Sequence, residues 1–232
     1  LIMDRMVRAA KAHNVAIGAH PGLPDLMGFG RRDMAVSAEE MEAMLAYQIG
    51  ALKGIATRHG VRVEHVSYHA AFGTMANSDQ DLADRLARVI AGLDSSLVML
   101  CMAGHPIEKA AQKAGLRVRY LFLADRAYQA DGTLVPRGQP GAVIHAPELM
   151  RERIGYFLKQ GGVITQDGTA LPIRRAPFSS IVTRRGQMFR RGLLRHTLWR
   201  LAGKSCARTD WPRRCGARLE MEYCKHNILI PV

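Results

Sequence analysis

Two aspartates and two arginines lie close together in residues 123–137, which read LADRAYQADGTLVPR and directly follow a short apolar run. A carboxylate such as Asp125 can activate water or orient a histidine, and the guanidinium groups of Arg126 and Arg137 can bind an anion. Asp131 begins an Asp-Gly-Thr sequence that is also an ordinary turn, so a purely structural role stays open for it. Ligands of α/β proteins bind at the carboxyl ends of strands, which makes this segment a candidate site.

A histidine and a second carboxylate follow another apolar run, residues 15–19, that we expect to be a strand. His20 comes directly after this run, and Pro21 restricts its backbone to extended conformations, so the imidazole is held on a stiff backbone. Asp25 lies five residues further on. The two side chains are candidates for an acid/base or ligand-orienting pair. The alternative is that His20 only caps the strand end and that Asp25 is a helix-cap or turn residue.

Residues 28–32, GFGRR, place two guanidinium groups beside flexible glycine backbone. Arginine can bind phosphate or carboxylate through two parallel hydrogen bonds, so we expect an anion site here, with Arg31 slightly favoured over Arg32. The alternative is a solvated basic loop. Because the chain contains no Walker A sequence, a nucleotide site in this protein would be of another kind.

His65 and His69 bracket a third segment, residues 65–70, which reads HVSYHA. His69 is a candidate catalytic residue, and the alternative is a core histidine whose hydrogen bonds are satisfied within the fold. The chain contains no Cys-x-x-Cys or His-Glu-x-x-His pattern, so we assign no metal ligand.

The candidate residues are separated by segments that alternate between strand and helix patterns. Apolar spacing predicts helices over residues 3–13, 38–59, 79–91, 106–114 and 148–160. Short apolar runs predict strands over residues 15–19, 62–66, 96–102, 118–123 and 163–165. This alternation predicts an α/β fold with a parallel sheet and helices outside it, either as an open layer or as a barrel.

Several helix ends carry recognisable signals. Ser37 followed by Glu40 predicts a capping box at the start of the second helix. Ser78 or Asn77 is the expected N-cap of the third helix. Gly115 is expected to end the fourth helix, and the pair Gly161 and Gly162 the fifth.

Four stretches of the chain resemble the LamB/YcsF family in their order and spacing. They are NVAIGAHPGLPD with GFGRR in residues 14–32, YQIGAL in residues 47–52, HVSYHA in residues 65–70, and residues 123–137. The resemblance covers roughly residues 1–173. It implies an incomplete seven-stranded β/α barrel, related to glycoside hydrolase and deacetylase folds and lacking here its first and last elements. The polar motifs would then lie together at the C-terminal face.

The resemblance implies ATP-dependent opening of 5-oxo-L-proline to L-glutamate, with ATP as co-substrate and Mg²⁺ as the companion of ATP. It also implies separate B and C subunits as partners, so that the chain would be the A subunit of a 5-oxoprolinase. On this basis we expect catalytic roles for His20, Asp25, His69 and Asp125, and substrate or phosphate binding by Arg31, Arg126, Asp131 and Arg137. No membrane partner is expected, because the chain has no run of about 18 apolar residues.

The chain departs from the family pattern in its third motif. The family usually has Lys-Pro-His-Gly where this chain has Ser67, Tyr68, His69 and Ala70. A lysine would suit a phosphate or a developing oxyanion, and no neighbouring residue obviously restores its charge. This departure puts the catalytic activity in question and leaves the fold assignment intact.

Composition changes abruptly near Ile173. Residues 174–232 contain 14 Lys and Arg against 3 Asp and Glu, and so carry most of the formal net charge of +13. We therefore expect a β/α domain over residues 1–173 and a basic, poorly ordered tail over residues 174–232 that is unrelated to the family. One hypothesis is that a shift of reading frame produced the tail, and that the chain is also truncated before Leu1, since family motifs expected upstream are missing.

Two alternatives to an active enzyme follow from these observations. The first is an inactive remnant of the enzyme, and the second is a nucleic-acid-binding protein that acts through its basic tail. Against the second, Cys206, Cys215 and Cys224 do not have a common zinc-finger spacing. Residues 1–173 contain one cysteine, Cys101, in an apolar run, which fits a cytoplasmic enzyme with a buried thiol.

Overall fold

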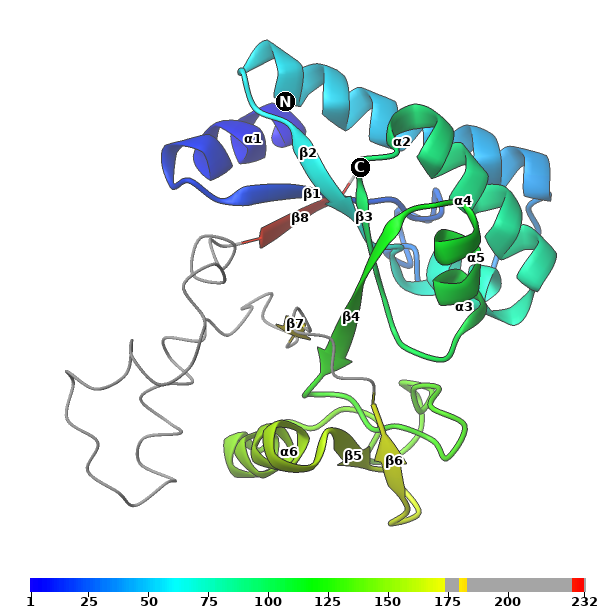
Figure 1. Ribbon diagram of the computed structural model, residues 1–232, viewed down its shortest axis with the longest axis vertical. Helices are drawn as coiled ribbons and strands as arrows, with labels where there is room; N and C mark the ends of the chain where they lie inside the picture. The colour runs from blue at the N-terminus through cyan, green and yellow to red at the C-terminus, as the bar shows by residue number, and fades with distance from the viewer. Residues whose placement is uncertain (174–179, 183–226, 232) are drawn as a thin grey trace. The chain divides into compact units, whose positions relative to one another are not determined.

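The computed structural model describes residues 1–173, 180–182 and 227–231 of the chain (Figure 1). It divides these residues into two compact units, of which the first is built mainly from Leu1–Phe122 and the second mainly from Leu123–Pro172. The expectation of a single domain over residues 1–173 does not foresee this division. The expectation of a poorly ordered basic tail over residues 174–232 lies almost wholly outside the described residues.

A parallel sheet forms the centre of the first unit. Its inner strands are β1 (Ala16–His20), β2 (Val63–Val66), β3 (Val98–Cys101) and β4 (Arg117–Leu123), and each pairs in parallel with the next. The short strands β7 (Ser180–Val182) and β8 (Asn227–Pro231) stand at the two ends of the order β7-β4-β3-β2-β1-β8. The expected parallel α/β sheet is confirmed. The pairings among the described strands leave this order open, so they do not show a closed barrel.

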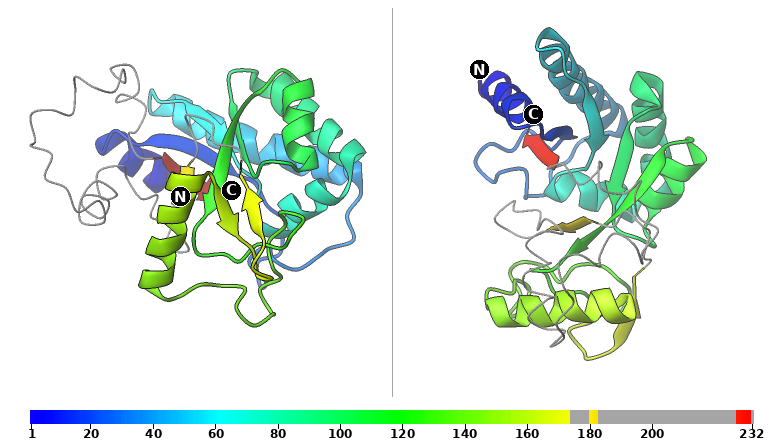
Figure 2. Two further views of the ribbon diagram at one scale, coloured as in Figure 1. Left: turned by 60° about the horizontal axis from the view of Figure 1, so that its bottom comes forward. Right: turned by 60° about the vertical axis from the view of Figure 1, so that its left-hand side comes forward.

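Helices of the first unit follow its strands as the apolar spacing predicts. They are α1 (Ile2–Ala12), α2 (Ala38–Arg58), α4 (Gln80–Asp94) and α5 (Pro106–Lys113), and Figures 1 and 2 show how they lie beside the strands. The sequence analysis missed one further helix, α3 (Ala70–Ser78), which begins directly after His69. None of the helices in the described part of the chain is long and apolar enough to cross a membrane.

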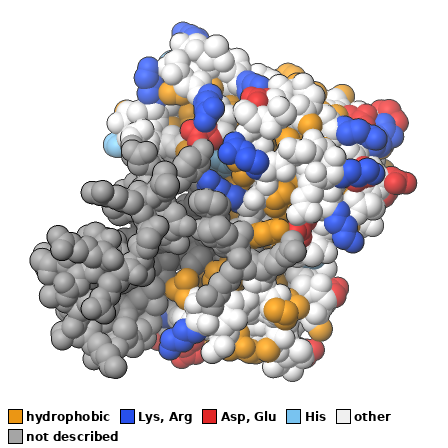
Figure 3. Space-filling view, in the orientation of Figure 1, with side chains coloured by type: hydrophobic (Ala, Val, Ile, Leu, Met, Phe, Trp, Pro, Cys, Tyr) orange, Lys and Arg blue, Asp and Glu red, His pale blue; other side chains and the backbone are white. Residues whose placement is uncertain are grey.

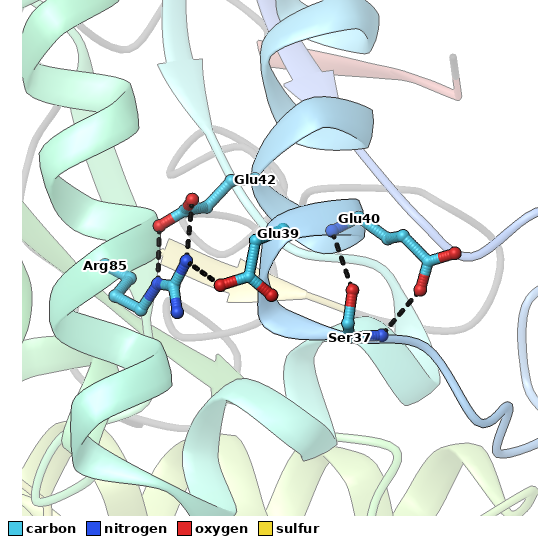
Figure 4. A network of polar contacts seen from close by, with 5 residues as sticks. All are labelled: Ser37, Glu39, Glu40, Glu42 and Arg85. Atoms are coloured by element: carbon cyan, nitrogen blue, oxygen red, sulfur yellow. Dashed lines mark hydrogen bonds and ion pairs between the residues drawn. The ribbon is translucent and has the colours of Figure 1, made fainter.

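Two helix caps test the expected start signals. At α2, the Ser37 hydroxyl accepts a hydrogen bond from the Glu40 amide, and the Glu40 carboxylate accepts one from the Ser37 amide, so the capping box is confirmed (Figure 4). At α4 the expected cap was wrong, because Asp79, and not Ser78 or Asn77, accepts from the first amides of the helix. Residue 78 cannot serve there since it is the last residue of α3.

An ion-pair network joins α2 and α4 at the surface. Arg85 of α4 donates to Glu42 at 2.7 Å and to Glu39 at 2.7 Å, and both acceptors belong to the first turns of α2 (Figure 4). On the face shown in Figure 3, Lys and Arg side chains of the described residues stand among acidic and neutral ones. Residues 1–173 contain 19 Lys and Arg and 17 Asp and Glu, so charge is nearly balanced in this part of the sequence.

The two faces of the sheet differ in composition, because side chains alternate along each strand. Ile17 and Ala19 of β1, Val66 of β2 and Met99 of β3 are buried in the core that the helices cover. An irregularity in the β1–β2 register pairs Ile17 with Val63 but Gly18 with His65, which turns His65 to the face opposite this core. That opposite face also bears His20, two residues after Gly18 on β1.

The second unit contains α6 (Pro147–Gln160) and an antiparallel pair of strands, β5 (Gly162–Ile164) and β6 (Ala170–Pro172). Gly161 ends α6 with a φ of 73°, as the glycine pair predicts. The strand over residues 163–165 exists, but it pairs with a β6 that the sequence analysis missed and does not join the parallel sheet. The alternation of strand and helix therefore ends before this point.

Candidate functional site

His20 stands at the carboxyl end of β1 and is fixed by the chain segment that follows β2. The amide of Ser67 donates to the carbonyl of Ala19 at 3.0 Å, which extends the strand pairing by one step. The carbonyl of Ser67 then accepts from Nδ1 of His20 at 2.6 Å. A carbonyl can only accept, so Nδ1 of His20 carries a proton, and in the neutral imidazole Nε2 presents a lone pair.

His69 meets that lone pair. Nδ1 of His69 lies 3.1 Å from Nε2 of His20, and the two rings meet edge to face with an interplanar angle of 75°. The other nitrogen of His69, Nε2, lies 2.7 Å from the carbonyl oxygen of Phe29. The backbone amide of His69 donates to the carbonyl of Pro21 at 2.8 Å. Two candidates 49 positions apart in sequence thus form one continuous hydrogen-bonded chain.

Burial controls the protonation of His20. Burial lowers the pKa of its imidazole to about 4, and the positive charges of His69 and Arg31 act in the same direction. The hydrogen bond to Ser67 opposes this shift without cancelling it. His20 is therefore neutral near pH 7 and can accept a hydrogen bond at Nε2.

Asp25 organises the loop beside the histidines. Its buried carboxylate accepts from the amide of Gly28 at 2.8 Å and from Nε of Arg32 at 3.0 Å, and it also binds Nη2 of Arg32. The hydrogen bond from Arg32 is the main reason why the pKa of Asp25 falls to about 2. The expected pairing of His20 with Asp25 is not among these contacts, because the nearby guanidinium occupies the carboxylate.

The two arginines of residues 28–32 have different surroundings. Arg32 is committed to Asp25, whereas the exposed guanidinium of Arg31 lies 5.7 Å from the centre of the Phe29 ring. Arg31 also acts electrostatically on His20. This difference supports the preference for Arg31 as the anion-binding residue of the pair.

Small residues make room for the imidazoles. A Cβ at Gly22 would come within 3.2 Å of Cβ of His69, and one at Gly30 within 3.0 Å of its Cδ2. Gly30 also has a φ of 64°, which glycine adopts without strain. The side-chain amide of Gln48 fixes Gly22 from the other side through hydrogen bonds of 3.0 Å and 2.9 Å to its backbone. Gln48 is a supporting residue that the sequence analysis did not identify, although it lies within the second family motif.

His65 is a third imidazole on this face of the sheet. It is 4% exposed, and its Nε2 is a buried side-chain atom without a hydrogen-bond partner in the described part of the chain. Burial lowers its pKa to about 4, with smaller effects of the same sign from Arg119 and His20. His65 is therefore neutral, and the sequence signal that could have placed it here was its spacing of two residues from Ser67 on one strand face.

The candidates of residues 123–137 lie in the second unit. Arg126 is buried there and supports the loop, since Nε donates to the carbonyl of Ala142 at 3.1 Å and Nη2 to that of Val135 at 2.5 Å. Asp131 closes a turn by accepting from the amide of Thr133 at 2.8 Å. These contacts give both residues structural work in addition to any part in binding.

Asp125 and Tyr128 lie together inside the second unit. Asp125 is 4% exposed, and its charge acts on Tyr128 and on Arg153. Burial raises the pKa of the Tyr128 phenol to about 12, so it stays protonated, and it accepts from the amide of Leu123 at 2.9 Å. Arg137, the remaining candidate, lies at the surface of this unit.

No cluster of three or more His, Cys, Asp or Glu side chains suited to a metal ion occurs within residues 1–173, 180–182 and 227–231. Cys101 is buried and unpaired with another cysteine among these residues, and burial raises the pKa of its thiol to about 12. A nucleophilic role does not suit such a thiol, because the thiolate is the reactive form.

The chain is similar to several known proteins over the region that contains this site. The model of the LamB/YcsF family matches residues 1–183. A relative from Pectobacterium atrosepticum, named as the A subunit of 5-oxoprolinase, is 52% identical over 173 residues, which are 75% of this chain and 67% of the relative. A second relative, from Bradyrhizobium diazoefficiens, is named as the first of its A subunits of 5-oxoprolinase, and it is 49% identical over 75% of this chain and 68% of the relative. The chain thus spans about two thirds of their length.

A solved structure supports the same relationship. The lactam utilization protein from Thermus thermophilus aligns with a TM-score of 0.74 at 38% sequence identity. The alignment covers 86% of this chain and 80% of that one.

Proposed function

Because this chain belongs to the LamB/YcsF family, we propose that it acts as the A subunit of an ATP-dependent 5-oxoprolinase, which opens 5-oxo-L-proline to L-glutamate. The observation that carries the proposal is the identity of 52% over 173 residues to a relative of that name. The family match over residues 1–183 includes the whole His20–His69 arrangement. The proposal includes the B and C subunits as partners and the incomplete seven-stranded barrel as the complete form of the sheet.

The chemistry of the ring explains the need for ATP. A five-membered lactam is an unreactive amide, and transfer of the terminal phosphoryl group of ATP to its oxygen makes the carbon electrophilic and releases ADP. Water then adds to this carbon, and the C–N bond breaks as the nitrogen takes up a proton. The acyl phosphate that remains is hydrolysed by a second water to L-glutamate and inorganic phosphate. A general base for water and donors for the developing negative charge are the groups that a protein must supply.

Residues of both units are proposed for these tasks. In the first unit, His20 and His69 lie within hydrogen-bond distance of one another, and Arg31 adds a positive charge beside them. Asp25 acts by holding the loop of residues 25–32 through Arg32. In the second unit Asp125 is the candidate base, while Arg126, Asp131 and Arg137 remain proposed binding residues. Mg²⁺ would enter with ATP, and we assign no protein ligand to it.

A reconstitution assay tests this function. The full chain would be combined with B and C subunits, and ADP and L-glutamate would be measured with and without 5-oxo-L-proline. We expect ADP release that depends on 5-oxo-L-proline and that falls by about 100-fold or more in a His69→Gln variant. A His13→Gln variant is the matched control, because His13 lies exposed at the end of α1. Absence of turnover with B and C subunits that are active in a complete enzyme from another source would contradict the proposal.

An inactive chain is the second candidate, and one observation favours it. Ala70, which stands where the family usually has glycine, has a φ of 40°, a backbone conformation that L-residues adopt only with strain. Ser67, which replaces the usual lysine, is buried and offers no charge. If this candidate is right, the double variant Ser67→Lys/Ala70→Gly will turn over 5-oxo-L-proline in the same assay when the unmodified chain does not.

A further inference from the structure

The hydrogen bonds of His20 and His69 require a definite number of protons. Three contacts follow one another: the Ser67 carbonyl to His20, His20 to His69, and His69 to the Phe29 carbonyl. Each contact needs one hydrogen, and both carbonyls at the ends can only accept. Two neutral imidazoles carry two ring protons between them. The complete arrangement needs three, so the pair holds one extra proton and one positive charge.

The location of the extra proton follows from the contacts. Nδ1 of His20 donates to Ser67, so Nε2 of His20 must be the acceptor between the two rings. His69 then donates from both nitrogens, which is possible only for the cationic imidazolium. Burial and the neighbouring positive charges keep His20 neutral, as the direction of its pKa shift indicates. The charge of the pair therefore resides on His69.

The groups around the pair do not neutralise this charge. The charged side chains that act on His20 are His69 and Arg31, and both are basic. Asp25, the acidic residue of the neighbouring loop, is bound by Arg32. His65, from β2, is neutral. His69 is also the N-cap of α3, and the N-terminal end of a helix carries a partial positive charge. Three features of one sign therefore converge where an anion would be stabilised.

We propose that the cationic His69, held by His20, donates a hydrogen bond from Nε2 to an anionic oxygen of the ligand, in the position that the Phe29 carbonyl occupies. This inference rests on the proposed function, in which the oxygen belongs either to the carboxylate of 5-oxo-L-proline or to a phosphoryl group. The Phe29 carbonyl belongs to a loop residue that is 61% exposed and has a φ of 56°, so moving it disturbs no core packing. His20 is then a positioning residue, and Arg31 is the second cation of the site.

A protonation experiment on the full chain, without partner subunits, tests the inference directly. Nitrogen-15 spectra of the histidine rings would be recorded between about pH 5 and pH 8, the range in which histidine titrates. At the low end we expect both nitrogens of His69 to be protonated, and only Nδ1 of His20. Because an anion prefers the charged form, its binding must raise the pH at which His69 loses its proton. A midpoint that an anion leaves unchanged would overturn the inference.

Three probes distinguish the sources of the oxygen. They are 5-oxo-L-proline, inorganic phosphate and 2-pyrrolidone, the last of which has the lactam ring without a carboxylate. A shift with 5-oxo-L-proline alone identifies the carboxylate, a shift with phosphate alone identifies a phosphoryl group, and both outcomes support the inference. An equal shift with 2-pyrrolidone would overturn it, because the charge of the ligand would then be irrelevant.

Two variants separate the positioning role from a merely structural one. A His20→Phe variant keeps the ring volume but removes the acceptor for His69, so we expect the midpoint of His69 to fall and the affinity for the effective anion to drop about tenfold. A His69→Gln variant keeps a neutral donor, and its anion affinity should no longer depend on pH. A His13→Gln variant should behave like the unmodified chain. Unchanged pH dependence in both site variants would contradict the inference.

The inference and the proposed function can fail independently. If the anion raises the midpoint of His69 but the assembled enzyme releases no L-glutamate, the anion site stands and the proposed function fails. If turnover is observed but no probe moves the midpoint, the function stands and His69 has another role.

Discussion

Gly18 of β1 lies directly under the imidazole of His65 on β2. A Cβ at position 18 would fall 2.1 Å from Nε2 of His65, far inside van der Waals contact. The two residues are register partners across the parallel pair, and the irregularity in the register is what brings them to the same face. The absence of a side chain at Gly18 is therefore a condition for the position of the buried His65 ring.

The close contact predicts that Gly18→Ala destabilises the protein. We expect a loss of roughly 1–3 kcal/mol in the free energy of unfolding, as for other overpacked cores, measured by urea denaturation. Gly54→Ala is the matched control, because a Cβ there meets nothing within 4 Å on the exposed side of α2. It should stabilise the helix by about 0.5–1 kcal/mol. If His65→Ala does not relieve the effect of Gly18→Ala, the contact is not its cause.

The backbone of Ala70 predicts a stabilising substitution. Its φ of 40° lies in the left-handed region, where the Cβ of an L-residue clashes with the backbone. Ala70→Gly should raise the free energy of unfolding by about 1 kcal/mol. In contrast, Ala71→Gly, one position further into α3, should lower it by about 1 kcal/mol. Equal effects of the two substitutions in thermal or urea unfolding would show that strain at position 70 is absent.

The ion pair of Asp25 and Arg32 predicts a loss of stability in acid. The pKa of Asp25 is about 2 in the folded chain, below its ordinary value of 3.8, so the unfolded chain takes up the proton first as pH falls. The contribution of the pair is therefore complete above the ordinary value and disappears as pH falls toward 2. Urea titrations across this window should show a smaller pH dependence for Arg32→Gln. Arg31→Gln, which leaves the contact intact, should retain the dependence of the unmodified chain.

The buried His65 predicts a second pH dependence at higher pH. Its pKa is about 4 in the folded chain against the ordinary 6.5, so protons bind preferentially to the unfolded chain between these values. Stability should thus be highest above the ordinary value and decline toward the folded value, by roughly 3 kcal/mol for a shift of this size. His65→Phe should flatten the decline in this window. A variant whose slope equals that of the unmodified chain would show that His65 is accessible to protons in the fold.

Local signals in the sequence were sufficient for several parts of this fold. The capping box of Ser37 and Glu40, the helix end at Gly161 and the strand that leads to His20 all depend on neighbours within a few residues. Where two local signals competed, the sequence was ambiguous. The cap of α4 moved to Asp79 because α3, whose apolar pattern is short, extends to Ser78.

The sequence by itself therefore determined the parallel α/β class, the order of its elements and the placement of polar residues after strands. Only the tertiary structure decided which of those residues meet. The pairing of His20 with His69, and that of Gly18 with His65, depends on the register between β1 and β2, which a single irregularity shifts. The physical reason is that alternation assigns side chains to a face within one strand, whereas contacts between strands depend on how separate segments align.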